Sequence, residues 1–114
     1  MRELEILGPD TWRDFVAAPL AVLVIGKSTC DACTQWSGEL EEFLSSDDAG
    51  HADVRFGKLL LDQRGLIEFK KEMEWLKDVT VLPFTVIFKD GEKVKDFAGS
   101  GIERLTNRLE RVTA

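Results

Sequence analysis

The chain of 114 residues is long enough for one folded domain, and its 44% hydrophobic and 32% charged residues are typical of a globular protein. Its net charge of −6 argues against binding to nucleic acid or to an anionic membrane surface, because both need an excess of lysine and arginine. The longest apolar stretch, residues 15–25, is interrupted by Pro19, is too short to span a membrane and follows an acidic rather than a basic segment. We therefore expect a cytoplasmic protein with a single domain over residues 1–114.

Strands and helices are predicted to alternate through the first part of the chain. Residues 3–7 are typical of a short strand, and residues 10–17 of a helix that ends before Pro19. Residues 20–25 form a continuous aliphatic run without polar alternation, which predicts a strand buried on both faces and central in its sheet. The next helix carries an apolar stripe at helical spacing, made of Cys33, Trp36, Leu40 and Phe43.

The second half of the chain continues this alternation and then changes to a hairpin. Residues 53–61 predict a strand, and the helix after it has its apolar face at Leu66, Phe69, Met73 and Leu76. Residues 84–88 predict another strand, and the turn at Asp90-Gly91 leads into an antiparallel strand through residues 94–97. A closing helix has apolar positions at Ile102, Leu105, Leu109 and Val112. The order β-α-β-α-β-α-β-β-α predicts an α/β protein whose mixed central sheet, parallel at first, has helices on both faces.

The two cysteines of the chain, Cys30 and Cys33, lie where a predicted buried strand ends and a helix begins. One neighbouring pair cannot be the disulfide framework of a small secreted protein. Unpaired N–H groups at a helix N-terminus favour an anion, so Cys30 is predicted to be the nucleophilic thiol. Cys33, one turn further into the helix, would be the resolving thiol that attacks a mixed disulfide. Asp31 opposes ionisation of the adjacent thiol, and Lys27 partly offsets this effect.

Other functions of the cysteine pair are open at this stage. A zinc site needs three or four ligands, and beyond the two cysteines the chain offers only His51 and carboxylates. We expect His51 to be an exposed loop residue without a role, and we expect no metal site. The alternatives to a redox enzyme are a metal or iron–sulfur carrier, in which two subunits share an ion or cluster, and a non-catalytic adaptor.

Together these features resemble the thioredoxin family over essentially the whole chain. The residues that carry the resemblance are the C-x-x-C after a strand, the segment KLLLDQ at 58–63, Val81-Leu82-Pro83, the hairpin at 88–92 and Gly99. The resemblance implies a thioredoxin-like fold and a thiol–disulfide oxidoreductase that acts in electron transport and cell redox homeostasis. It also implies disulfide-containing protein substrates, an unidentified reductase or dithiol donor, no cofactor, and a monomer.

The resemblance also implies how substrates bind. Pro83 would be a cis-proline that faces the dithiol, and the backbone of Leu82 would pair with an extended substrate segment. Trp36 would border this substrate surface, although packing is the commoner role of an aromatic residue on a helical core stripe. We therefore predict that Leu82, Pro83 and Trp36 bind substrate.

The chain departs from the usual thioredoxin pattern at positions around the dithiol. Thioredoxins usually have Trp-Cys-Gly-Pro-Cys, whereas this chain has Thr29 before the first cysteine and Asp31-Ala32 between the two. Val24 stands where thioredoxins have a buried carboxylate, and Lys58 matches a lysine of the family near that position. We predict that Asp31 and Lys58 modulate the site. Residues 64–79 are a longer segment than in typical thioredoxins, which is consistent with a dedicated partner.

Overall fold

The computed structural model describes residues 3–46 and 53–113, so His51 lies outside the described residues. Within that part of the chain no helix is both long and apolar enough to cross a membrane. The elements are β1 (Leu4–Leu7), α1 (Trp12–Val16), β2 (Leu20–Gly26), α2 (Asp31–Ser45), β3 (Arg55–Leu60), α3 (Ile67–Glu72), the short 3-10 helix η1 (Glu74–Asp78), β4 (Phe84–Lys89), β5 (Glu92–Ala98) and α4 (Ile102–Thr113).

The strands form one mixed sheet in the order β1-β3-β2-β4-β5. β1, β3 and β2 are parallel neighbours, whereas β4 is antiparallel to β2 and forms a hairpin with β5. All residues of β2 are buried, as a continuous aliphatic run between two neighbouring strands requires. The predicted central strand and the antiparallel hairpin are confirmed.

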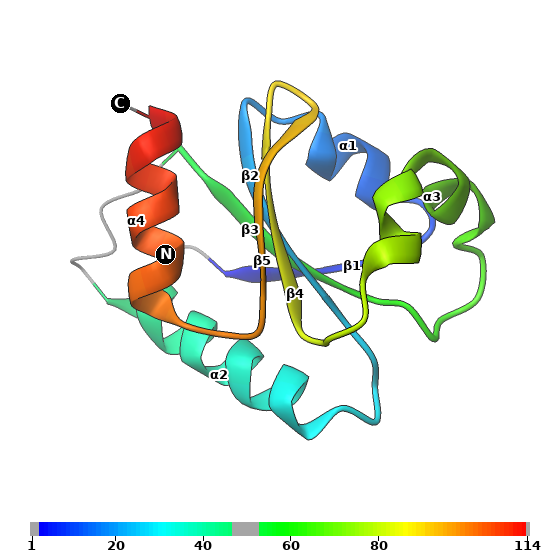
Figure 1. Ribbon diagram of the computed structural model, residues 1–114, viewed down its shortest axis with the longest axis horizontal. Coiled ribbons are helices and arrows are strands. Elements are labelled where there is room, and N and C mark those ends of the chain that lie inside the picture. The colour runs from blue at the N-terminus through cyan, green and yellow to red at the C-terminus, as the bar shows by residue number, and fades with distance from the viewer. Residues whose placement is uncertain (1–2, 47–52, 114) are drawn as a thin grey trace.

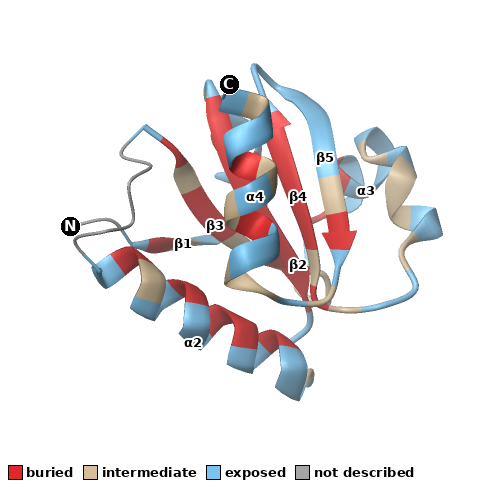
Figure 2. Cartoon of the chain, turned by 60° about the vertical axis from the view of Figure 1, so that its left-hand side comes forward, coloured by how far each residue is buried: buried red, intermediate tan, exposed pale blue. Residues whose placement is uncertain are grey.

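Helices cover both faces of the sheet, as predicted, with α2 and α4 on one face and α1 and α3 on the other (Figure 1). The side chains of β2 alternate between two apolar cores: Val22 and Val24 pack toward α2 and α4, and Leu23 and Ile25 toward α1 and α3. Figure 2 shows buried residues along β2 and β4 and along the side of α2 that faces the sheet. The N-terminal end of α2 is therefore held by a core on one side and open to solvent on the other.

The continuous helix predicted through Leu66 and Leu76 is wrong, because the chain leaves the helix at Met73. Met73 has φ −95° and ψ 72°, and it separates α3 from η1. In a continuous helix Trp75 would lie on the face opposite Leu66, away from the core. After the break its ring stacks on Phe84 of β4 with the ring centroids 5.9 Å apart. Packing of Trp75 against the sheet therefore accounts for the break.

Candidate active site

Cys30 and Cys33 form a disulfide at the N-terminus of α2, with their Cα atoms 5.2 Å apart. Cys30 is the N-cap residue of the helix, with an extended backbone at φ −100° and ψ 108°. Its Sγ accepts a hydrogen bond from the backbone N–H of Cys33 at 3.2 Å. The sulfur thus takes the place of the oxygen that usually caps a helix, beside N–H groups that favour a negative charge.

The two sulfur-bearing side chains differ in their access to solvent. Cys33 is only 4% exposed, whereas Cys30 is partly exposed and is followed by the exposed Asp31. The end of β2 approaches Cys33 closely: a Cβ added at Gly26 would lie 3.1 Å from both the Cβ and the Sγ of Cys33. Cys30 is therefore the sulfur that an external disulfide reaches first.

Leu82 and Pro83 lie at the same edge of the sheet as the dithiol. β4 is antiparallel to β2, and Phe84 pairs with Ile25, so the residues before Phe84 lie beside those that follow Ile25. The Leu82-Pro83 peptide bond is cis, as predicted. Pro83 is buried and its carbonyl accepts a hydrogen bond from the Gly99 N–H at 2.7 Å, whereas Leu82 is only half-buried.

The expectation that Trp36 contacts substrate is wrong. Its side chain is 0% exposed in the core beneath α2, so it offers no surface to a bound segment. Its Nε1 donates a hydrogen bond of 3.1 Å to Oγ1 of Thr85, which is also 0% exposed. Trp36 therefore joins the helix that carries the dithiol to the strand that follows Pro83.

Lys58 and the buried Cys33 line the same small cavity. Lys58 pairs with Val24 across β3 and β2, and Val24 is 2% exposed. This cavity of about 200 Å³ lies between β3, α2 and the residues that follow β2. Its lining includes Cys33, Lys58, Lys27, Thr34 and Ser37. Among the residues that the structure describes, no carboxylate lines this cavity, and its charged lining residues are Lys27 and Lys58.

Asp62 is a site residue whose contact the sequence motif at 58–63 did not predict. Its carboxylate accepts hydrogen bonds from the Ser28 hydroxyl and, at 3.2 Å, from the Ser28 backbone N–H. These bonds, first that of the hydroxyl, hold the pKa of Asp62 below its ordinary value of 3.8. Asp62 follows β3 closely, and parallel neighbouring strands end at one edge of a sheet, so its position along the chain could have revealed this contact.

A larger cavity of about 450 Å³ adjoins Leu82 on the side of α3 and η1. Its lining combines lysines with apolar side chains, principally Lys27, Lys70, Lys77, Leu61, Leu76 and Leu82. The sequence did not predict this cavity because its walls come from four separate segments. In the described ranges no cluster of three or more His, Cys, Asp or Glu side chains could hold a metal ion.

Comparison with known proteins identifies the fold. No family model and no curated protein sequence matches the chain. Among solved structures it is similar to thioredoxin Mala s 13 of Malassezia sympodialis, with a TM-score of 0.76, 19% identity and coverage of 100% of this chain and 94% of that one. It is similar to spinach chloroplast thioredoxin f, with a TM-score of 0.76, 18% identity and coverage of 98% and 88%. A thioredoxin f2 in complex with ferredoxin:thioredoxin reductase has a TM-score of 0.76, 23% identity and coverage of 98% and 96%. The chain has the thioredoxin fold.

Proposed function

We propose that this protein is a thiol–disulfide oxidoreductase that reduces or exchanges disulfides of protein substrates through Cys30 and Cys33. The observation that carries the proposal is the disulfide at the N-terminus of α2, with one accessible and one buried cysteine. Its place beside the Leu82-Pro83 segment and the thioredoxin fold of the chain support the same activity.

In the proposed reaction the reduced protein transfers two electrons to a substrate disulfide. The Cys30 thiolate attacks one substrate sulfur, the substrate S–S bond breaks, and the other substrate sulfur leaves as a thiolate that takes up a proton. The Cys33 thiolate then attacks Sγ of Cys30, which releases the second substrate thiolate and forms the Cys30–Cys33 disulfide. The helix N-terminus and the Cys33 N–H favour the thiolate form of Cys30 in the first step.

Leu82 and Pro83 are the proposed binding residues for the substrate chain. An extended segment would add to the backbone at Leu82, a mode that gives affinity through main-chain hydrogen bonds and tolerates many sequences. The half-buried side chain of Leu82 and the 51% exposed Val81 support an apolar contact there.

Asp31 and Lys58 are the proposed modulators of the two thiols. Asp31 is exposed next to Cys30, and its negative charge would oppose the thiolate. Lys58 lines the same cavity as Cys33, from which carboxylates are missing, so its positive charge would favour the thiolate of the resolving cysteine.

A reductase is the proposed electron donor, and the protein would act as a monomer in the cytoplasm, where thiol reductants keep dithiols reduced. The similar thioredoxin f2 forms a complex with ferredoxin:thioredoxin reductase, which supports a reductase as partner. Because residues 64–79 form a cavity beside Leu82, a partner specific to this chain would contact that segment.

Cysteine substitutions test the proposed roles. With insulin as the disulfide substrate, Cys33→Ser should accumulate a mixed disulfide through Cys30, because no second thiol releases it. Cys30→Ser should trap little, since Cys33 is 4% exposed, and the double serine variant serves as the control. Non-reducing electrophoresis with mass analysis measures the adducts. Equal trapping by both single variants would contradict the assignment.

A redox titration tests the function as a whole. Free thiols are counted in metal-free protein equilibrated with defined thiol–disulfide couples, and each ~30 mV of potential corresponds to about 1.4 kcal/mol. A reversible two-electron transition supports the oxidoreductase. If no disulfide forms with any couple, the proposal is wrong. Stoichiometric metal in the purified protein would then favour a metal or iron–sulfur carrier, and undiminished partner binding by the double serine variant would favour an adaptor.

A further inference from the structure

The cavity of about 450 Å³ beside Leu82 is lined by exposed lysines and by half-buried apolar side chains. We call the lysines, Lys27, Lys70 and Lys77, its rim, and the leucines, Leu61, Leu76 and Leu82, its floor. We infer that it is a specificity site for substrate segments in which an acidic and an apolar residue flank the reactive cysteine. This inference rests on the proposed oxidoreductase function, because it concerns the substrate of the same dithiol.

The rim concentrates positive charge in an acidic protein. Three of the eight lysines line this one cavity, although the net charge of the chain is −6. The ion pairs found in residues 3–46 and 53–113 involve Arg13, Arg55 and Lys93, and none of them includes a lysine of the cavity. The rim therefore has positive charge available for a ligand.

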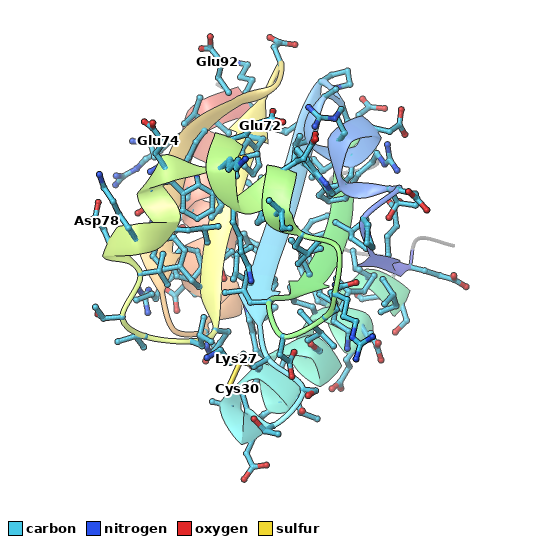
Figure 3. All side chains as sticks on the ribbon, turned by 90° about the vertical axis from the view of Figure 1, so that its right-hand side faces the viewer. Lys27, Cys30, Glu72, Glu74, Asp78 and Glu92 are labelled. Atoms are coloured by element: carbon cyan, nitrogen blue, oxygen red, sulfur yellow. A yellow bond between two sulfur atoms is a disulfide. The ribbon has the colours of Figure 1, made fainter. Side chains whose placement is uncertain are left out.

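Within residues 3–46 and 53–113 neither Lys70 nor Lys77 forms an ion pair, although Asp78 follows Lys77 directly in the chain. Asp62 interacts electrostatically with Lys27, which it partly neutralises. Figure 3 shows Lys27 beside Cys30, with Glu72, Glu74 and Asp78 of the α3 and η1 segment all farther from the disulfide than Lys27 is. Because Asp62 already acts on Lys27, the attraction for a negative group is assigned mainly to Lys70 of α3 and Lys77 of η1, which line the same cavity.

The floor of the cavity would accept an apolar side chain. Leu61, Leu76 and Leu82 line it and are each only half-buried, so their remaining surface can be covered by a ligand. Such burial favours binding because it removes apolar surface from water. Lysines around an apolar floor extend their methylene groups along it and keep their ammonium groups in water, where these can meet a carboxylate.

The cavity lies within reach of a segment attached to Cys30. Leu82 is both a wall of the cavity and the residue proposed to pair with the substrate backbone. On the other side, the backbone N–H of Cys30 donates to the carbonyl of Lys27, a second wall residue, at 3.3 Å. An extended chain advances about 3.3 Å per residue, so the residues within two or three positions of the reactive cysteine lie over the cavity.

Two synthetic disulfide peptides test this inference. They share one sequence with a leucine near the cysteine and differ only in flanking residues, which are glutamates in one and lysines in the other. The reduced protein should reduce the glutamate peptide on the order of tenfold faster at low salt, because complementary charge raises the association rate. The ratio of the two rate constants should fall toward one at high salt. Equal rates for the two peptides at low salt would overturn the inference.

Charge reversal within α3 provides a matched comparison. Lys70→Glu should lower the ratio of rate constants to about one, because the substitution removes one positive charge and its new carboxylate offsets the charge of Lys77. Lys71→Glu makes the same change of charge at the next residue, which is also exposed but does not line the cavity, and should keep the wild-type ratio. A cooperative thermal unfolding transition is required of both variants as the check that they are folded. If both variants lower the ratio equally, net charge rather than the cavity selects the substrate, and the inference is wrong.

Two further measurements separate this inference from the proposed function. Reduction of a small uncharged disulfide, bis(2-hydroxyethyl) disulfide, reports the dithiol chemistry alone. If that reaction proceeds while the peptides are not distinguished, only the inference about the cavity fails. If no disulfide is reduced, the proposed function fails, and the cavity is tested by fluorescence anisotropy with peptides whose cysteine is serine. Tighter binding of the glutamate peptide, lost in Lys70→Glu, supports the site, whereas equal binding overturns it.

Discussion

The buried hydrogen bond between Trp36 and Thr85 is predicted to stabilise the fold by an amount that one substitution can reveal. Thr85→Val retains nearly the same shape but removes the oxygen that accepts the bond from Trp36 Nε1 at 3.1 Å. Both side chains are 0% exposed, so water cannot replace the lost acceptor. A buried donor left without a partner costs about 1–3 kcal/mol, out of a typical total stability of about 5–15 kcal/mol.

The prediction is measured by urea unfolding followed by far-UV circular dichroism. Thr85→Val should lower the free energy of unfolding by about 2 kcal/mol at an unchanged m-value, which corresponds to a Tm lower by roughly 8 °C for a chain of 114 residues. Thr85→Ser is the control, because it keeps the acceptor and loses one methyl group, at about 0.8 kcal/mol before any cavity cost. In a Trp36→Phe background, where no N–H needs a partner, Thr85→Val should cost less.

Which of the variants Thr85→Val and Thr85→Ser is more stable tests whether the hydrogen bond contributes to stability. If packing alone counted, Thr85→Val would be at least as stable as Thr85→Ser, and that result would refute the reasoning. The bond also connects α2, one turn after Cys33, to the strand that follows Pro83. We therefore expect folded Thr85→Val to reduce insulin more slowly than the wild type, because the dithiol and the substrate-pairing segment are less firmly held together.

Further predictions concern two glycines and one carboxylate. Gly57→Ala should destabilise the protein by about 1–3 kcal/mol in urea unfolding, because its Cβ would lie 2.9 Å from the Phe15 ring. Gly38→Ala should stabilise the protein by about 0.5–1 kcal/mol, because Gly38 lies within α2 and an added Cβ would meet no packing neighbour within 4 Å. If both glycine variants changed the free energy of unfolding in the same direction, the packing described around these glycines would be contradicted. The lowered pKa of Asp62 means that the folded state binds fewer protons than the unfolded state near pH 3–4. The stability that the Asp62 carboxylate contributes is therefore present above its ordinary pKa of 3.8 and is lost as the pH falls through its lower pKa in the folded state. The difference in free energy of unfolding between the wild type and Asp62→Asn should therefore shrink in acid. A difference independent of pH would argue against a role for the bonds from Ser28.

Local signals in the sequence were sufficient for most of the architecture and for the dithiol. The aliphatic run at 20–25 predicted the buried central strand because only a strand with neighbours on both sides can hide every side chain. The place of Cys30 followed from the change of pattern at residues 27–30, where a strand gives way to a helix. Strand alternation, helical spacing and helix starts depend on neighbouring residues, so they can be recognised without the fold.

The tertiary structure alone decided which distant segments meet. The spacing of the apolar residues suggested one helix through Leu76, but packing of Trp75 on Phe84 divides it at Met73. Similarly, an aromatic residue one turn after Cys33 can point to solvent or to the core, and its bond to Thr85 shows that Trp36 belongs to the core. The lysine-rimmed cavity is built from segments far apart in the chain, and no local pattern records which side chains line it. Periodicity reports how much of an element is buried, whereas its partners are set by the packing of the whole chain.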